Sequence, residues 1–116
     1  MAQGKAPAFQ FYPADWVMST RTIPAEARGV YIDLLSFAWS EEGLPADLSG
    51  LESYVGLPKA KFRKLWDAHL KTRWESDGNG RLVNPRQEKE REKQRQWREK
   101  SAKGGRASGK AKGNQK

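Results

Sequence analysis

The sequence predicts a mainly α-helical protein with a small β-hairpin: a winged helix-turn-helix body, then a long polar C-terminal helix and a disordered basic tail. Two helical stretches are separated only by Gly56 and Leu57, and a strong hairpin signal follows them directly. After residue 84 the chain has almost no apolar residue to bury. We therefore expect a flexible lead-in over 1–8, a winged-helix domain over 9–84, a polar basic helical arm over 85–103 and a disordered basic tail over 104–116.

The charge of the chain is concentrated at its C-terminal end. Residues 1–84 hold ten Lys or Arg and ten Asp or Glu, whereas residues 85–116 hold twelve Lys or Arg and four Glu. The formal net charge of +8 therefore belongs entirely to the last 32 residues. This asymmetry indicates a neutral folded body with a basic extension for a polyanion, either nucleic acid or an acidic membrane surface.

The composition excludes several classes of protein. There is no Cys, which rules out disulfides, thiolate zinc sites and Cys nucleophiles. No apolar run approaches the roughly 20 residues of a membrane span, and the start of the chain lacks the apolar core of a secretory signal. We expect a cytoplasmic protein with no membrane partner.

The aromatic stretch "FQFYPADWVM" predicts an extended segment laid over the core, with a short turn at residues 14–15, because Pro13 and Asp15 disfavour a regular strand. Two interpretations of its polar and aromatic side chains stay open. In the favoured one, Tyr12 and Trp16 are core anchors and Asp15 caps a turn or a helix start. In the other, Asp15 and Trp16 form a contact site for a partner.

The stretch "IPAEARGVYIDLLSFAWSEEG" predicts the central, most buried helix. Pro24 fits the first helical position, Glu26 suits the first turn, and Gly43 ends the helix. Gly29 interrupts it at a cost of about 1 kcal/mol relative to Ala, which predicts that another backbone packs closely there. The apolar residues repeat with a period of 3.6 and face the core: Ala27, Val30, Tyr31, Ile32, Leu34, Leu35, Phe37, Ala38 and Trp39.

The next two helices form a helix-turn-helix candidate. We expect a turn, a short helix capped near Asp47 and a C-terminal cap at Gly56, then a recognition helix over 58–71. The inner stripe of the second helix is Phe62, Leu65, Trp66, His69 and Leu70. Its outer cations are expected to contact phosphates or base edges, although an ordinary solvated surface is the alternative: Lys59, Lys61, Arg63, Lys64 and Lys71.

The motif "SDGNG", flanked by Trp74 on one side and by Leu82 and Val83 on the other, predicts a β-hairpin. A hairpin directly after a helix-turn-helix is the wing of a winged helix. Arg73 and Arg81 lie on either side of it, and we expect both to contact DNA.

A helix start follows, with Asn84 as the cap, Pro85 at the first position and Gln87 placed to reach back to the cap. A polar helix without an apolar stripe is marginal by itself and gains most by docking on something charged. Trp97 either folds back on the body or stacks on a base or a partner. The cations of the arm and tail that we expect to bind DNA are Arg91, Arg95, Arg98, Lys100, Lys103, Arg106, Lys110 and Lys112.

Several separated motifs, "FYPADW", "EARGVYIDLL", "W…GLP", "KFRKLW" and "DGNGRLVNPRQEKE", occur in this order. Together they resemble a phage and prophage domain family of unknown function that includes the YdaU proteins, over roughly residues 9–105. The resemblance implies a winged-helix fold and a gene neighbourhood of phage replication, often beside a helicase loader. It brings neither a reaction nor a catalytic residue. The matching positions are Tyr12, Pro13, Asp15, Trp16, Gly29, Tyr31, Leu34, Leu35, Trp39, Trp66, Gly80 and Asn84.

Catalysis is not expected. The acids are scattered along the chain, and "GKAKGN" lacks both the spacing of a phosphate-binding loop and a preceding strand. His69, the single histidine, falls on the inner stripe and is expected to be packed, without Cys or a second His for a metal site. The sequence therefore predicts a non-enzymatic protein with no cofactor, no metal and no small-molecule substrate.

The predicted function is that of a DNA-binding accessory protein of phage or prophage origin, in replication initiation. The helix over 58–71 and the wing over 74–83 would dock on duplex DNA, and the arm would add grip that reads no sequence. Two alternatives stay open. One is an adaptor for a helicase loader or another replication protein, and the other is a small transcriptional regulator.

Overall fold

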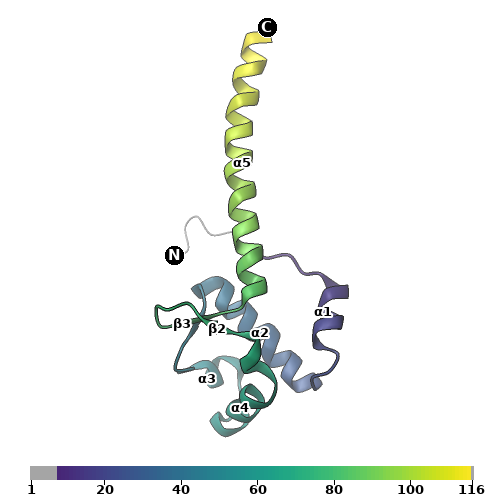
Figure 1. Cartoon of the computed structure of the whole chain (residues 1–116), viewed down its shortest axis with the longest axis vertical. Helices are drawn as coiled ribbons and strands as arrows, with labels where there is room; N and C mark the ends of the chain where they lie inside the picture. Colours follow the sequence, from purple (N-terminus) through teal and green to yellow (C-terminus); the bar gives the residue numbers. More distant parts are fainter. Residues whose placement is uncertain (1–7, 116) are drawn as a thin grey trace.

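A body of short helices and a small sheet carries one long helix that stands away from it (Figure 1). The computed structural model describes the backbone of residues 8–115 and the side chains of residues 8–102. In chain order the elements are α1 (Pro13–Thr20), α2 (Ala25–Glu41), β1 (Leu44–Pro45), α3 (Leu51–Val55), α4 (Lys59–Leu65), the π-helical turn η1 (Trp66–Leu70), the 3-10 turn η2 (Lys71–Arg73), β2 (Glu75–Ser76), β3 (Arg81–Val83) and α5 (Pro85–Gln115).

Helix α2 is the centre of the core, as its apolar period predicted. Seven of its side chains are buried: Ala27, Val30, Tyr31, Leu34, Leu35, Ala38 and Trp39. Ile32 and Phe37 from the predicted face are only partly buried and pack against the outside of the core. Pro24 is the N-terminal cap residue rather than the first helical residue. The other elements pack around α2 and bury Leu44, Leu51, Phe62, Trp66, Leu70 and Trp74 against it.

The prediction of an extended segment at the N-terminal aromatic stretch was wrong from Pro13 onward, where α1 begins. Pro13 and Asp15 do disfavour a strand, but the same residues favour a helix start. Proline fits the first turn, where its missing N–H is not needed, and an acid there suits the helix dipole. Residues 8–12 are not helical and lead into α1.

The predicted hairpin is confirmed, and it belongs to a sheet with a third strand. The strand order is β1-β3-β2, and both pairings are antiparallel. Asp77 shapes the turn because its Oδ1 accepts hydrogen bonds from the backbone N–H groups of Asn79 at 2.7 Å and Arg81 at 3.2 Å. Strand β1 was predicted as part of a turn. Two residues are too few to give a strand signal, and pairing of Leu44 with Leu82 places them in the sheet.

The two helices of the predicted helix-turn-helix are present. Helix α3 begins at Leu51, later than a cap at Asp47 would place it, and Asp47 instead accepts a hydrogen bond from the Ser49 backbone in a turn. Gly56 ends α3 in the left-handed conformation with φ of +79°, as predicted. The second helix is continuous but changes its winding, from α4 through η1 to η2. The wide π turn keeps Trp66 and Leu70, four residues apart, on the same inner side, where both are buried.

Helix α5 begins at Pro85 directly after the sheet and is helical to Gln115. The sequence predicted a helix that ends at 103 and a disordered tail over 104–116, so the described backbone differs from that prediction. A helix satisfies its backbone hydrogen bonds locally, and this stretch can therefore continue without packing against the body. From Arg95 to Ala102 every side chain of α5 is exposed.

Replacing Gly29 with alanine is expected to raise the free energy of unfolding by about 0.5–1 kcal/mol. The prediction that another backbone packs closely at Gly29 was wrong, since a Cβ added there meets nothing within 4 Å. The substitution therefore removes the entropic cost of glycine in a helix without creating a clash. Urea unfolding followed by circular dichroism measures the change.

Gly43→Ala is the matched control, with the opposite sign. Gly43 has φ of +123°, and a Cβ there would lie 2.9 Å from the Leu82 carbonyl oxygen in the adjoining strand. This variant should lose about 1–3 kcal/mol of stability. A destabilised Gly29→Ala protein would show that α2 packs more tightly at this position than the structure indicates.

Candidate nucleic-acid interface

The helix that was predicted to be the recognition helix carries most of the positive charge of the otherwise neutral body. The 15 residues from Lys59 to Arg73 contain six Lys or Arg and one acid, Asp67, a net charge of +5. Because residues 1–84 are neutral as a whole, the rest of that region carries −5. The positive charge of the body is therefore concentrated on α4, η1 and η2. A polyanion that approaches the body is attracted to these elements.

Four of the five predicted cations of this helix are free to meet a ligand. Their side chains are exposed, and none of them forms an ion pair within the part of the chain that the structure describes: Lys59, Arg63, Lys64 and Lys71. The fifth, Lys61, lies 2.8 Å from Glu26 of α2 in an ion pair that is about half exposed on both sides. We call the four free residues the α4 cations.

Arg73 was predicted to contact DNA beside the hairpin, but the structure places its side chain against the body. It lies in η2, before β2, and its guanidinium forms hydrogen bonds within the body. Its Nη1 and Nη2 donate to the hydroxyl and the backbone carbonyl of Ser19 at 2.8 and 2.7 Å. The guanidinium also lies 5.1 Å from the centre of the Tyr31 ring. Arg73 thus ties the end of α1 to the core.

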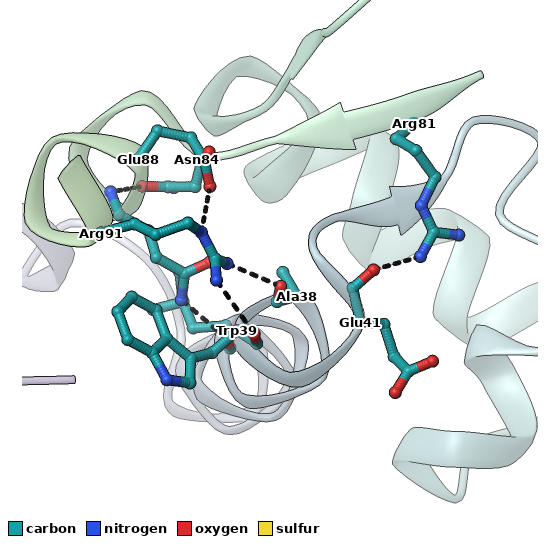
Figure 2. A network of polar contacts seen from close by, with 9 residues as sticks. Ala38, Trp39, Glu41, Arg81, Asn84, Glu88 and Arg91 are labelled. Atoms are coloured by element: carbon teal, nitrogen blue, oxygen red, sulfur yellow. Dashed lines mark hydrogen bonds and ion pairs between the residues drawn. The ribbon is translucent and has the colours of Figure 1, made fainter. Parts of the chain in front are cut away.

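Arg81 and Arg91, also predicted to contact DNA, instead bind the C-terminal end of α2 (Figure 2). Arg81 of β3 donates to the backbone carbonyl of Glu41. Arg91 of α5 donates to the carbonyls of Ala38 and Trp39, at 3.0 and 3.2 Å, and lies 4.4 Å from the Trp39 ring centre. The last turn of α2 has no cation of its own, and these two arginines place positive charge against its carbonyl end. The Ala38 carbonyl also accepts the backbone N–H groups of Glu42 and Gly43.

Asn84 and Gln87 fix the start of α5 on the body. The Oδ1 of Asn84 accepts the backbone N–H of Gln87 at 3.0 Å, which confirms the predicted cap. Its Nδ2 donates to the Tyr31 hydroxyl and to the Arg73 carbonyl. Gln87 was expected to reach back to the cap. Its Nε2 donates instead to the carbonyl of Leu35 at 2.8 Å, because α2 lies beside the first turn of α5.

Other predicted arm cations differ in their surroundings. Arg95 is bound on both sides, by Glu92 and by Glu99, and its hydrogen bond to Glu92 holds the pKa of that carboxyl below its usual value. Arg98 and Lys100 are exposed on the same helix. Four further cations belong to α5 by their backbone, while their side chains lie outside the described residues: Lys103, Arg106, Lys110 and Lys112.

The anchoring interpretation of the N-terminal motif holds for Trp16 only, because Tyr12 is 40% exposed and Asp15 makes an ion pair rather than a capping hydrogen bond. Trp16 is half-buried and stacks on Tyr31, with ring centroids 5.4 Å apart. Asp15 lies in the first turn of α1, 2.6 Å from Arg86 of α5. The hydroxyl of Tyr12 donates to Glu90 of α5 at 3.2 Å. The last two contacts connect the start of α1 to α5 at the surface.

A pocket that the sequence analysis did not find opens between residues 9–12, α1, α2 and the first turns of α5. Its volume is about 310 Å³. Its apolar wall is formed by Phe9, Phe11, Trp16, Tyr31, Ile32 and Leu35, and its edge on α5 by Arg86, Gln87, Lys89, Glu90 and Lys93. No sequence signal indicates such a pocket, because its walls come from three segments that are far apart in the sequence.

No protein-family model, curated protein or solved structure matches this chain. The resemblance to the phage and prophage family that includes the YdaU proteins therefore stays a prediction. Within the described residues, no helix is both long and apolar enough to cross a bilayer.

Proposed function

We propose that residues 9–84 form a winged helix-turn-helix domain and that the chain is a non-enzymatic protein that binds duplex DNA through α4. Between α2 and α5 the elements run α2-β1-α3-α4-β2-β3, with β1, β3 and β2 in one antiparallel sheet. This order supports the winged-helix assignment, in which α4 with η1 is the recognition helix and the hairpin of β2 and β3 is the wing.

The observation that carries the proposal is the set of α4 cations: Lys59, Arg63, Lys64 and Lys71 are exposed, unpaired within the described residues and placed on the helix that would enter the major groove. Because the rest of the body is acidic, this side is the one that a phosphate backbone would approach. With Arg73 and Arg81 bound to the body, the wing contributes shape rather than charge.

The motif resemblance adds a pathway to this proposal: an accessory role in phage or prophage replication initiation, in the cytoplasm of the bacterial host. An adaptor for a helicase loader is the second candidate. It is favoured by the outer side of α1, where Val17 and Met18 are 58% and 68% exposed. Exposed apolar side chains on a helix suit a protein partner better than a phosphate backbone.

Lys64→Glu is expected to weaken binding of a fluorescein-labelled 20-base-pair duplex about tenfold in ~100 mM salt, because one phosphate contact is lost and a repulsion is gained. Fluorescence anisotropy with the full chain measures the dissociation constant. Arg21→Glu, an equal charge change at an exposed residue at the end of α1, is the matched control and should change it less than threefold.

Equal losses in the two variants would mean that only overall charge matters, which contradicts docking through α4. The adaptor would be favoured if neither variant lost affinity for the duplex and if Val17→Asp abolished capture of a replication protein by the chain.

A further inference from the structure

The pocket beside α5 is lined mainly by aromatic and aliphatic side chains. Gln87, one of its lining residues, is only 5% exposed and is held in place by the hydrogen bond from its Nε2 to the Leu35 carbonyl. Its Oε1 has no hydrogen-bond partner within the described residues, but this atom is closed to solvent and is not an open acceptor for a ligand. A ligand in the pocket therefore meets mainly rings and aliphatic groups, and the pocket fits a flat ring.

The edge of the pocket supplies positive charge. Its two acids are already bound, Asp15 to Arg86 and Glu90 to Tyr12 and Gln94. Lys89 and Lys93 line the same edge, are exposed and form no ion pair within the described part of the chain. A ligand with a ring in the pocket and an anionic group outside it would meet both lysines.

These two lysines continue into a line of residues along α5. Lys89, Lys93, Trp97 and Lys100 are spaced by four, four and three residues, so they lie on one side of the helix. We call them the α5 stripe. The acids Glu88, Glu92 and Glu99 lie on the neighbouring side, where they pair with Arg91 and Arg95. Trp97 is 67% exposed, about 12 Å along the helix from Lys89.

We infer that the pocket and the α5 stripe bind single-stranded nucleic acid. One base enters the pocket and packs against its aromatic walls, a second base stacks on Trp97, and the lysines of the stripe neutralise the neighbouring phosphates. A peptide with an aromatic side chain would fit the pocket as well. The nucleic acid is favoured because cations and a second exposed aromatic side chain repeat along the helix, as the phosphates and bases of a strand do.

The test uses the full chain and a fluorescein-labelled 12-nucleotide single-stranded DNA. Trp97→Ala and Phe11→Ala should each weaken binding at least about fivefold, since one base loses its stacking surface or its pocket wall. Tyr54→Ala is the matched control, because Tyr54 is also an exposed aromatic residue but lies on α3, and this variant should bind as the unchanged chain does. Both Trp97 and Phe11 are more than half exposed, so these variants should keep their fold, as circular dichroism can verify.

A 12-nucleotide strand that keeps its phosphates but lacks its bases separates base binding from simple attraction. It should bind at least about tenfold more weakly than the normal strand. Equal affinity for the two strands would overturn the inference. It would also be overturned if neither Trp97→Ala nor Phe11→Ala weakened binding of the normal strand, while Phe11→Ala weakened binding of an acidic peptide that contains tryptophan. Lys64→Glu should leave single-strand binding intact, so the failure of this inference and the failure of duplex docking through α4 give different results.

Discussion

Replacing Asn84 with alanine will lower the free energy of unfolding by about 3 kcal/mol. Asn84 is 4% exposed and joins three parts of the molecule: it caps α5, and its amide donates to Tyr31 of α2 and to the backbone at Arg73. Loss of the cap costs about 1 kcal/mol. The hydroxyl of Tyr31 and the Arg73 carbonyl then lose a donor in the interior, which costs about 1–3 kcal/mol more.

Urea unfolding, followed by tryptophan fluorescence and by far-UV circular dichroism, measures the change. Asn79→Ala in the exposed hairpin turn is the matched control, because the Asn79 contact in the turn is made by its backbone N–H, not by its side chain. It should change the stability by less than about 0.5 kcal/mol. Comparable effects of the two substitutions would mean that the Asn84 amide does not join α5 to the body.

The parts of the fold that could be predicted are those with a local cause. The apolar period of α2, the glycine that ends α3 and the "SDGNG" turn each act over a few neighbouring residues. Helix α1 was missed because Pro13 and Asp15 were interpreted only as evidence against a strand. Strand β1 was missed because its two residues depend on their partners in β3.

In the candidate site, too, the contacts that depend on distant parts of the chain could not be predicted. Charge alone suggested that Arg73, Arg81 and Arg91 contact DNA, whereas the structure places all three against backbone carbonyls of the body. A free helix end attracts an arginine as a phosphate does, and the sequence does not distinguish the two acceptors. The α5 stripe, by contrast, could have been found from the helical spacing of Lys89, Lys93 and Trp97.

The affinity of the full chain for duplex DNA is expected to fall at least about a thousandfold between ~50 and ~200 mM salt. Six cations lie from Lys100 to the end of the chain, with no acid among them. If all six neutralise phosphates, the slope of log affinity against log salt is about −5. The α4 cations add to that slope when α4 also contacts the duplex. Anisotropy titrations at several salt concentrations measure it.

Replacing the six C-terminal cations with glutamine separates the two contributions. The slope of log affinity against log salt should then become less negative by about 5. The remaining slope should be about −4, which the four α4 cations supply. An unchanged slope would mean that the C-terminal cations do not contact the duplex. A slope near zero would mean that α4 does not, and the attraction of the chain to DNA would then belong to its last residues alone. A residual slope that also depends on Lys64 would show that α4 contacts the phosphates of the duplex, and the choice of a DNA site would then need base contacts in addition.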